Sequence, residues 1–451
     1  KERTIDIITK YFPAFTRQML NKKLNKKKWI LIKRFIDKKT LDSLIQEGLI
    51  GIRLQNVYKR IYPDDNLFSH VVGYADIDGK GLAGLERYYN NILYNNDVRL
   101  SLNKSVQSII RDELINTFEK HNPKNIFAIV MDVQTGEIIS SISFPDYNPN
   151  KQINAINENM RNVVTSSVME LGSVFKIFTL AFALENGLSS QYKIRIKDGI
   201  TLEDKKVIKD EHAKSDVLTI EEIFYKSSNV GSGIIATMFG KKKYTDFLKN
   251  IGVFKKLQTN LPDGEIAAPF FNSKDYSISR IVTTSYGYGV SLSPLHFISI
   301  ANGIVNNGLY IPPTFIKNGN KGTAPIRIVS SKTSKEVIRI ANKVVTEGTG
   351  MSASLNEYKI CGKTGTSQKF DNKTKTWSNE KKFVSFLSIF PCSNPKYIMY
   401  IGVDEPKPNK QTMAQTYSQI FGGTITAPLS SKIISIISPM LNIQSDQDNK
   451  I

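Results

Sequence analysis

Two residues whose types and spacing could do chemistry, Ser173 and Lys176, lie at the mouth of a strongly apolar stretch. Between Val174 and Leu184 the only other residue that is neither aliphatic nor aromatic is Thr179. Such a stretch predicts a helix that is buried on all sides within a domain. Because residues three apart share one face of a helix, the serine hydroxyl and the lysine amine would lie together on its first turn. A buried ammonium is costly unless the protein uses it, so the pair indicates a nucleophilic serine assisted by a lysine.

A second polar segment, Ser227-Ser228-Asn229, follows a predicted helix over residues 218–226. The small, apolar run from Val230 to Met238 comes next and predicts another buried helix. The turn would therefore present hydroxyl and amide groups at a helix entrance. Serine and lysine three apart also occur by chance in a chain so rich in lysine, and each segment is weak evidence when it is taken alone.

A third segment, Lys363-Thr364-Gly365-Thr366, follows a strand-like run over residues 358–362. Its beginning also looks like the end of a phosphate-binding loop, but that motif requires glycine at position 357, where this chain has Glu357, and no helix is predicted to follow. The remaining interpretation is a strand edge that offers an ammonium, two hydroxyls and free N–H groups. These groups suit a carboxylate-bearing peptide that binds as an added strand.

Composition sets the broad class. The 451 residues are enough for about two or three domains with proper cores, and 40% hydrophobic with 23% charged residues is ordinary globular usage. The formal charge of +20 is unusual, but the lysines occur in scattered short runs and not in one stripe interleaved with aromatic residues. We therefore expect solvated faces, or attraction to anionic lipid or wall polymer, and no nucleic-acid partner.

Cysteines and histidines indicate no metal site. Cys361 and Cys392 are too few for a disulfide framework, and the sequence leaves open whether they pair. The four histidines show no ligand spacing, so neither a metal nor an organic cofactor is expected. No stretch is long and apolar enough for a membrane span, and no signal peptide opens the chain. A first residue other than methionine, Lys1, favours a fragment whose upstream part is missing.

The elements around these segments predict an α+β fold. Residues 126–133 and 137–144 are typical of a hairpin, and residues 383–390 and 397–403 of two later strands. A last helix is expected over residues 427–440. An early hairpin and late strands thus flank a helical middle, so we expect one sheet that joins both ends of a domain.

In this order the three polar segments resemble the three signatures of penicillin-binding proteins and serine β-lactamases. Residues 132–136, 144–150 and 286–289 also look like parts of that family's transpeptidase domain. Residues 60–63, 70–74 and 79–86 resemble the non-catalytic pedestal of class B penicillin-binding proteins. Across residues 76–86 the chain is closer to the division-specific type, FtsI (penicillin-binding protein 3), than to the elongation-specific type.

The resemblance implies two domains. Residues 1–96 would form the pedestal, incomplete at its N-terminus, and residues 97–451 the transpeptidase domain, an antiparallel sheet with flanking helices and a helical subdomain. The chain departs from the family at Leu171, where proline is usual, so the approach to Ser173 could be set differently. The family's first pedestal motif and its N-terminal membrane helix are also absent from the sequence, which again favours a truncated chain.

The resemblance also implies a serine D,D-transpeptidase mechanism. Ser173 would attack the carbonyl between two terminal D-alanines of a peptidoglycan stem peptide and release the last one. Lys176 is the candidate base, and burial together with the charge of Lys363 would lower its pKa from the ordinary value of about 10.4. Ser227 would relay a proton to the leaving amine. Backbone N–H groups of Ser173 and Thr366 would hold the oxyanion.

Substrate binding is assigned by the same resemblance. Lys363, Thr364 and Thr366 would bind the terminal carboxylate, and Asn229 would hold the substrate amide and the amine of the base. Gly365 would let the substrate backbone come close to the strand. An amine from a neighbouring stem peptide would then resolve the acyl-enzyme and form the cross-link, whereas β-lactams would mimic the donor and leave Ser173 acylated.

The implied partners are donor and acceptor stem peptides, β-lactam antibiotics and division-complex proteins that include a glycosyltransferase. The implied location is the bacterial inner membrane, reached through the missing helix, with the catalytic domain in the periplasm. Three alternatives stay open: an elongation-type enzyme, a D,D-carboxypeptidase or β-lactamase that passes the acyl group to water, and a non-catalytic sensor or scaffold. The extra domain before residue 96 and the lack of a candidate deacylating glutamate argue against a β-lactamase.

Overall fold

The computed structural model describes residues 1–26, 29–48, 51–151, 158–203, 205, 207–210, 215–271, 277–371 and 373–446. It contains two compact units, one formed by Lys1–Ile61 with Ala75–Lys80 and the other by Tyr62–Tyr74 with Gly81–Ile451. The predicted limits of the two family domains, 1–96 and 97–451, are not tested by this division and stay a prediction. Among the described residues, no helix has both the length and the apolar character that a membrane crossing requires.

The smaller unit contains three helices, α1 (Glu2–Tyr11), α2 (Arg17–Lys26) and α3 (Lys38–Gln46). The start of α3 is fixed by Asp37, whose side chain accepts a hydrogen bond from the backbone N–H of Thr40. The buried hydrophobic residues of this unit form a small core of their own: Ile5, Ile7, Ile8, Phe12, Leu20 and Leu44.

The larger unit is built on one antiparallel sheet of five strands in the order β12-β13-β14-β1-β2. The early strands are β1 (Asn125–Asp132) and β2 (Ile138–Phe144), and the late strands are β12 (Cys361–Asp371), β13 (Thr376–Phe390) and β14 (Tyr397–Asp404). Strand β1 pairs with β2 on one side and with β14 on the other. The predicted α+β fold, with a sheet that joins early and late segments, is therefore confirmed.

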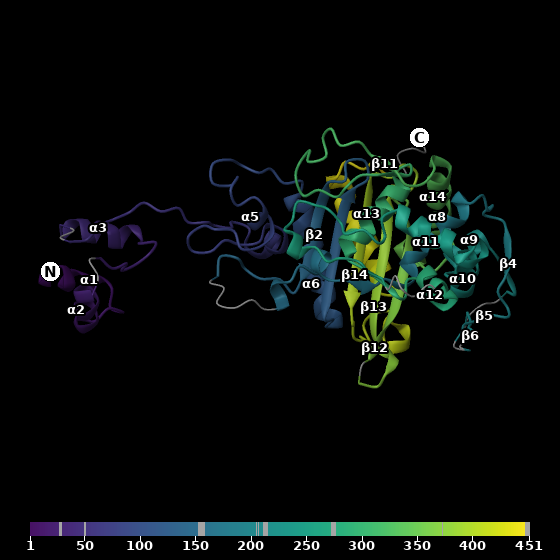
Figure 1. Ribbon diagram of the computed structural model, residues 1–451, viewed down its shortest axis with the longest axis horizontal. Helices are drawn as coiled ribbons and strands as arrows, with labels where there is room; N and C mark the ends of the chain where they lie inside the picture. Colours follow the sequence, from purple (N-terminus) through teal and green to yellow (C-terminus); the bar gives the residue numbers. More distant parts are fainter. Residues whose placement is uncertain are drawn as a thin grey trace. The chain divides into compact units, whose positions relative to one another are not determined.

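Both faces of this sheet are covered, because side chains alternate between the two faces along each strand. In β1, Phe127 and Ile129 belong to the core on one side, and Ile126 and Ala128 to the core on the other. Helices α6 (Lys104–His121) and α15 (Thr426–Met440) pack on the second of these faces. Figure 1 shows α6 next to β2 and most helices of the middle part grouped together at the right of the picture.

The helices of the middle part are α8 (Lys176–Glu185), α9 (Ile220–Tyr225), α10 (Asn229–Met238), α11 (Lys241–Asn250), α12 (Ile278–Ser285), α13 (Pro294–Val305) and α14 (Ser331–Thr346). Shorter elements complete the unit: α4 (Ser69–Val72), α5 (Gly84–Tyr88), α7 (Val163–Ser166), β3 (Met169–Glu170), β4 (Lys193–Arg195), β5 (Ile200–Thr201), β6 (Val207–Ile208), β7 (Val217–Thr219), β8 (Phe270–Phe271), β9 (Val290–Leu292), β10 (Leu309–Tyr310) and β11 (Ile326–Arg327). Helix α8 is buried over nearly its whole length, as its apolar sequence predicts.

Strand β12 differs from its prediction, because it begins at Cys361 and includes the polar segment 363–366, which was expected to follow a strand over 358–362. Lysine, threonine and glycine do not show the apolar pattern of a buried strand, so sequence alone places the strand too early.

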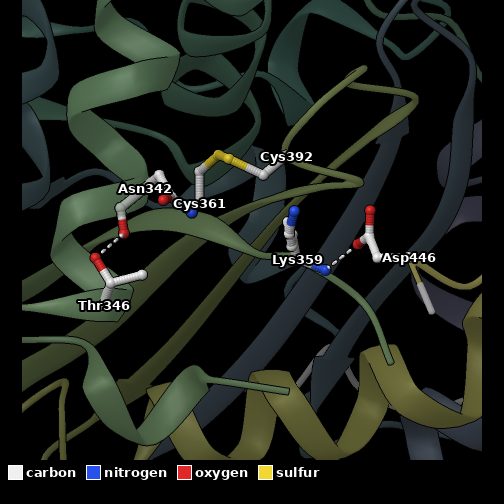
Figure 2. Close-up of a disulfide and its surroundings, with 6 residues drawn as sticks. All are labelled: Asn342, Thr346, Lys359, Cys361, Cys392 and Asp446. Atoms are coloured by element: carbon white, nitrogen blue, oxygen red, sulfur yellow. Dashed lines mark hydrogen bonds between the residues drawn. A yellow bond between two sulfur atoms is a disulfide. The ribbon is translucent and has the colours of Figure 1, made fainter. Parts of the chain in front are cut away.

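A disulfide joins Cys361, at the start of β12, to Cys392, just after β13, with the two Cα atoms 5.2 Å apart. The sequence left this pairing open. The backbone N–H of Cys392 also donates to the carbonyl of Lys359 over 2.8 Å. Figure 2 shows the bond between the two strands, with Asn342 of α14 beside it. The covalent link fixes the beginning of β12 against its neighbour.

Candidate active site

The predicted nucleophile lies in a tight turn that packs against β12. Residues Gly172–Phe175 form a short 3₁₀-helix, η3, directly before α8. Gly172 has a φ of +59°, and a Cβ added there would lie 2.6 Å from the carbonyl oxygen of Thr366. Only glycine meets both conditions without strain. The close approach places Ser173, which is partly exposed, next to the free edge of β12.

Leu171, which stands where the family usually has proline, has a backbone conformation that proline also allows. Leu171 has a φ of −80° and a ψ of −15°, close to the φ of about −65° that a proline ring imposes. Its side chain is buried in the main core. The backbone therefore approaches Ser173 in a conformation that proline would also adopt.

Lys176, the predicted base, is fully enclosed, with only 1% of its surface exposed. Its Nζ donates to the carbonyl oxygen of Ser227 over 2.6 Å, to Oδ1 of Asn229 over 2.7 Å and to Oγ of Ser227 over 3.2 Å. Burial lowers the pKa of Lys176 to about 7, and the negative charge of Asp210 opposes that shift. At neutral pH this amine is therefore partly deprotonated and can accept a proton.

Lys363 reaches the same hydroxyl from the opposite side. Its Nζ donates to Oγ of Ser227 over 3.0 Å and to the carbonyl oxygen of Thr364 over 3.1 Å. The residue is 0% exposed, and burial, followed by the charge of Lys176, holds the pKa of Lys363 well below its ordinary value. Ser227 itself has a φ of +65°, an uncommon conformation for a residue with a side chain.

The turn 227–229 is held by the start of α10. Ser228 caps this helix, because its Oγ accepts a hydrogen bond from the N–H of Gly231 over 2.8 Å. Asn229 is the first residue of α10, and its side chain points back to Lys176 through the hydrogen bond of Oδ1. The structure thus joins four of the predicted residues by hydrogen bonds: Lys176 of α8, Ser227 and Asn229 of the turn, and Lys363 of β12.

The rest of the third segment lies along the edge of the sheet. β12 is an edge strand of the described sheet, paired on one side with β13. The N–H of Gln368 donates to the hydroxyl of Tyr288 over 3.0 Å, so this N–H points away from β13. Because the direction alternates along a strand, the N–H groups of Thr364 and Thr366 face the same free edge. Thr366 therefore offers a backbone donor beside the turn that contains Ser173.

The side chains of this segment are themselves positioned by neighbouring loops. Oγ1 of Thr364 lies 2.5 Å from Oγ1 of Thr349, and Oγ1 of Thr366 accepts a hydrogen bond from the N–H of Gly422 over 3.2 Å. A Cβ added at Gly365 would lie 2.4 Å from Oγ of Ser385. The structure thus gives Gly365 a packing role within the sheet, in addition to the substrate approach inferred from the sequence.

The aromatic bend at residues 286–289 supports the nucleophile turn from its other side. A Cβ added at Gly287 would lie 2.2 Å from the carbonyl oxygen of Gly172, and the N–H of Gly172 donates to the carbonyl of Gly287 over 3.3 Å. The carboxylate of Glu170 accepts a hydrogen bond from the N–H of Gly289 over 2.6 Å. The turn is thus fixed between this bend and β12.

Known proteins match this arrangement over most of the chain. Residues 126–434 match the penicillin binding protein transpeptidase domain, and residues 53–114 match the penicillin binding protein A dimerisation domain. The chain belongs to the penicillin-binding protein transpeptidase family. The family predicted from the three polar segments is therefore confirmed.

Curated relatives of this family member include proteins named as probable peptidoglycan D,D-transpeptidases. The chain is 32% identical to the probable peptidoglycan D,D-transpeptidase FtsI of Caulobacter vibrioides, over 89% of this chain and 70% of that protein. It is 29% identical to the probable peptidoglycan D,D-transpeptidase PenA of Neisseria gonorrhoeae, over 90% of this chain and 73% of that protein. The predicted similarity to the FtsI type is confirmed.

Solved structures agree with the fold. Penicillin-binding protein 3 of Mycobacterium tuberculosis in its apo form has a TM-score of 0.75 and 27% identity, covering 86% of this chain and 92% of that chain. The same protein complexed with ampicillin has a TM-score of 0.76 and 26% identity, covering 87% of this chain and 92% of that one.

Sequence reasoning missed several residues of this family member's site. Asp210, Tyr288 and Thr349 bond to the 227–229 turn or to β12, but each comes from a loop or bend distant in sequence. A single aspartate, tyrosine or threonine in a loop carries no spacing that marks it. The glycine-rich spacing around Tyr288 was the one available signal, and it indicated a bend without indicating what the bend touches.

Proposed function

We propose that this chain is a division-specific peptidoglycan D,D-transpeptidase that cross-links stem peptides through an acyl-enzyme on Ser173. The observation that carries the proposal is the position of Ser227, whose Oγ accepts hydrogen bonds from Nζ of Lys176 and of Lys363. A hydroxyl between two buried amines of lowered pKa is suited to proton transfer and is of little use as a structural contact alone.

Acylation then follows from the residues present. Lys176, neutral in part at pH 7, takes the proton of Ser173 as Oγ attacks the carbonyl of the penultimate D-alanine. Backbone N–H groups of Ser173 and Thr366 stabilise the oxyanion that forms. As the intermediate collapses, the peptide C–N bond breaks, and the proton passes from Lys176 through Ser227 to the leaving amine of the last D-alanine.

The free edge of β12 accounts for substrate orientation. The N–H groups of Thr364 and Thr366 are available to a peptide added as a strand, whereas that of Gln368 is already bonded to Tyr288. The amine of Lys363 would donate to the terminal carboxylate, whose negative charge would favour the protonated form of that amine. Because Oδ1 of Asn229 accepts from Lys176, its Nδ2 is the group that can donate to a substrate carbonyl.

An amine of a neighbouring stem peptide attacks the acyl-enzyme and regenerates Ser173, which forms the cross-link. Hydrolysis by a D,D-carboxypeptidase or β-lactamase would require an activated water at this step. The relatives from Caulobacter vibrioides and Neisseria gonorrhoeae are both named as D,D-transpeptidases, which favours transfer to an amine. β-Lactams would acylate the same serine, which is supported by solved relatives complexed with aztreonam and ampicillin.

The proposed location is the outer side of the bacterial inner membrane, with a membrane anchor outside this sequence and contacts to division proteins that include a glycosyltransferase. The Cys361–Cys392 disulfide supports an extracytoplasmic location, because such bonds persist in oxidising compartments such as the periplasm. The FtsI-named relatives support the assignment to septal wall synthesis.

The test is covalent labelling with a fluorescent penicillin, followed by mass spectrometry of the adduct. We expect one equivalent of a long-lived adduct on Ser173 and none in the Ser173→Ala variant, whose thermal unfolding should stay close to that of the wild type. Adduct on another residue would overturn the assigned nucleophile. Rapid turnover of the penicillin would overturn the transpeptidase in favour of a hydrolase.

A further inference from the structure

Asp210 lies outside the three sequence signatures and yet bonds to two of the three residues of the second one, Ser228 and Asn229. Its Oδ1 accepts hydrogen bonds from the N–H of Asn229 over 2.8 Å and of Val230 over 3.3 Å. Its Oδ2 accepts a short hydrogen bond from Oγ of Ser228. One carboxylate thus holds three consecutive residues at the turn that carries Ser227.

Helix capping alone does not account for this carboxylate. Ser228 already caps α10 through Gly231, and a neutral acceptor would satisfy the remaining N–H groups equally well. A carboxylate adds a full negative charge beside a site that otherwise contains two lysines. Placing that charge against the start of α10 is favourable, because the positive end of the helix dipole faces it.

The negative charge of Asp210 also affects the protonation of Lys176, the proposed base. Among the described residues, the titratable groups that face Asp210 or Lys176 are Lys363 on β12 and Tyr286 ahead of β9. Burial raises the pKa of Tyr286, so this phenol stays neutral and contributes no charge near pH 7. Asp210 is then the acidic group that favours the protonated form of Lys176 against burial.

We infer that Asp210 is a positioning residue of the acylation site: it holds the turn that carries Ser227 and Asn229, and it places a negative charge behind the two residues that bond to Nζ of Lys176. It acts through this turn, because its hydrogen-bond partners among the described residues are Ser228, Asn229 and Val230. This inference rests on the proposed function, because its readout is the acylation of Ser173 by a penicillin.

The experiment measures the second-order rate of penicillin acylation against pH for the wild type and for Asp210→Asn. Asparagine keeps an acceptor for the two backbone N–H groups and removes the charge. We expect the acidic limb of the profile to move to lower pH, because Lys176 loses the negative charge that helps it keep its proton. A helix cap alone would change the rate at every pH by the same factor and leave the limb in place.

Two further variants keep the test decisive. Asp210→Ala, which removes every acceptor, should also lower the plateau rate by roughly tenfold or more, since charged hydrogen bonds to the turn are lost. Asp210→Ser is a second neutral variant that repeats the pH measurement if asparagine impairs folding, which thermal unfolding monitors.

The matched control is Asp216→Asn in the same part of the chain, whose carboxylate is 59% exposed and pairs with Lys197 over 2.8 Å. It should leave both the rate and the limb unchanged.

The outcomes separate the two proposals. A wild type that takes no penicillin at any pH would overturn the proposed function itself. A wild type that acylates with an acidic limb, together with neutral Asp210 variants whose limb does not move, would overturn the role of Asp210 alone. A limb that also shifts in the Asp216 variant would show that the shift reflects general surface charge, and would overturn it as well.

Discussion

The side-chain amines of Lys176 and Lys363, which lie on α8 and β12, donate to the same oxygen, Oγ of Ser227, over 3.2 and 3.0 Å. A hydroxyl that accepts from both amines has its own proton left to donate to another group. Under the proposed function, this arrangement would carry a proton from Lys176 through Ser227 to the leaving amine. Ser227 has an uncommon φ of +65° in the conformation that places its hydroxyl between the two lysines.

Removal of this hydroxyl is the most direct test of the path. We expect Ser227→Ala to lower the rate of penicillin acylation by roughly 10²-fold or more, because a positioned proton donor is lost. Stopped-flow labelling with a fluorescent penicillin measures the rate. Ser215→Ala is the matched control, because Oγ of Ser215 is exposed and, among the described residues, bonds only to the backbone carbonyl and N–H of Val217. Acylation at the wild-type rate in the Ser227 variant would remove the hydroxyl from the path.

Burial of Lys176, the proposed base, should also make the free energy of unfolding depend on pH. Its pKa is about 7 in the folded chain and ordinary in the unfolded chain, so the unfolded chain binds more protons between about pH 7 and pH 10.5. The penalty of burying Lys176 is therefore full below pH 7 and is relieved as pH rises toward 10.5. Relative to Lys176→Met, the free energy of unfolding of the wild type should increase over this range by an amount on the order of a few kcal/mol. Urea titrations of both proteins at pH 7 and pH 9.5 test this, and a constant difference would contradict it.

The sequence predicted the residues of the site better than it predicted the contacts that hold these residues in place. Three short segments carry residue types that are costly to bury, and their resemblance, in this order, to the signatures of a known family indicated that Ser173, Lys176 and Lys363 act together. The strand 361–371 was placed too early, over 358–362, because the polar residues from Lys363 to Thr366 lack the apolar pattern of a buried strand. Nζ of Lys363 lies over the ring of Phe224, 5.7 Å from the ring centroid, and donates to Ser227 and Thr364, and none of these contacts is visible in local sequence.

The contacts made by glycines were likewise not predictable from the sequence. Their density at residues 286–289 indicated a bend, and nothing in the sequence showed that Gly287 would press on Gly172, which precedes the nucleophile. Such contacts join segments more than a hundred residues apart. A single sequence cannot predict such contacts, because glycine has no side chain whose chemical type would indicate what lies next to it.

The Cys361–Cys392 disulfide should stabilise the start of β12. It links residues 31 apart in sequence, and a link of this span stabilises by about 2–4 kcal/mol, mainly through the unfolded state. These are the chain's two cysteines, so a reductant acts on this bond alone. We expect dithiothreitol to lower the midpoint of thermal unfolding, and Cys361→Ser with Cys392→Ser to do so equally and without further response to the reductant. An unchanged midpoint in the reduced wild type would contradict a stabilising role.

Gly287→Ala tests the support of the nucleophile turn. The added Cβ would lie 2.2 Å from the carbonyl oxygen of Gly172, at a φ of +88°, so the bend and the turn must move apart. We expect acylation to fall by roughly 10²-fold, since small misplacements of a nucleophile cost about that much. Gly187→Ala is the matched control, because Gly187 has a φ of +84° with nothing within 4 Å of the added Cβ. The control carries the backbone strain alone, about 1–2 kcal/mol of stability, and should keep the wild-type acylation rate. Equal loss of acylation in the two variants would show that strain, and not contact with Gly172, is what Gly287 relieves.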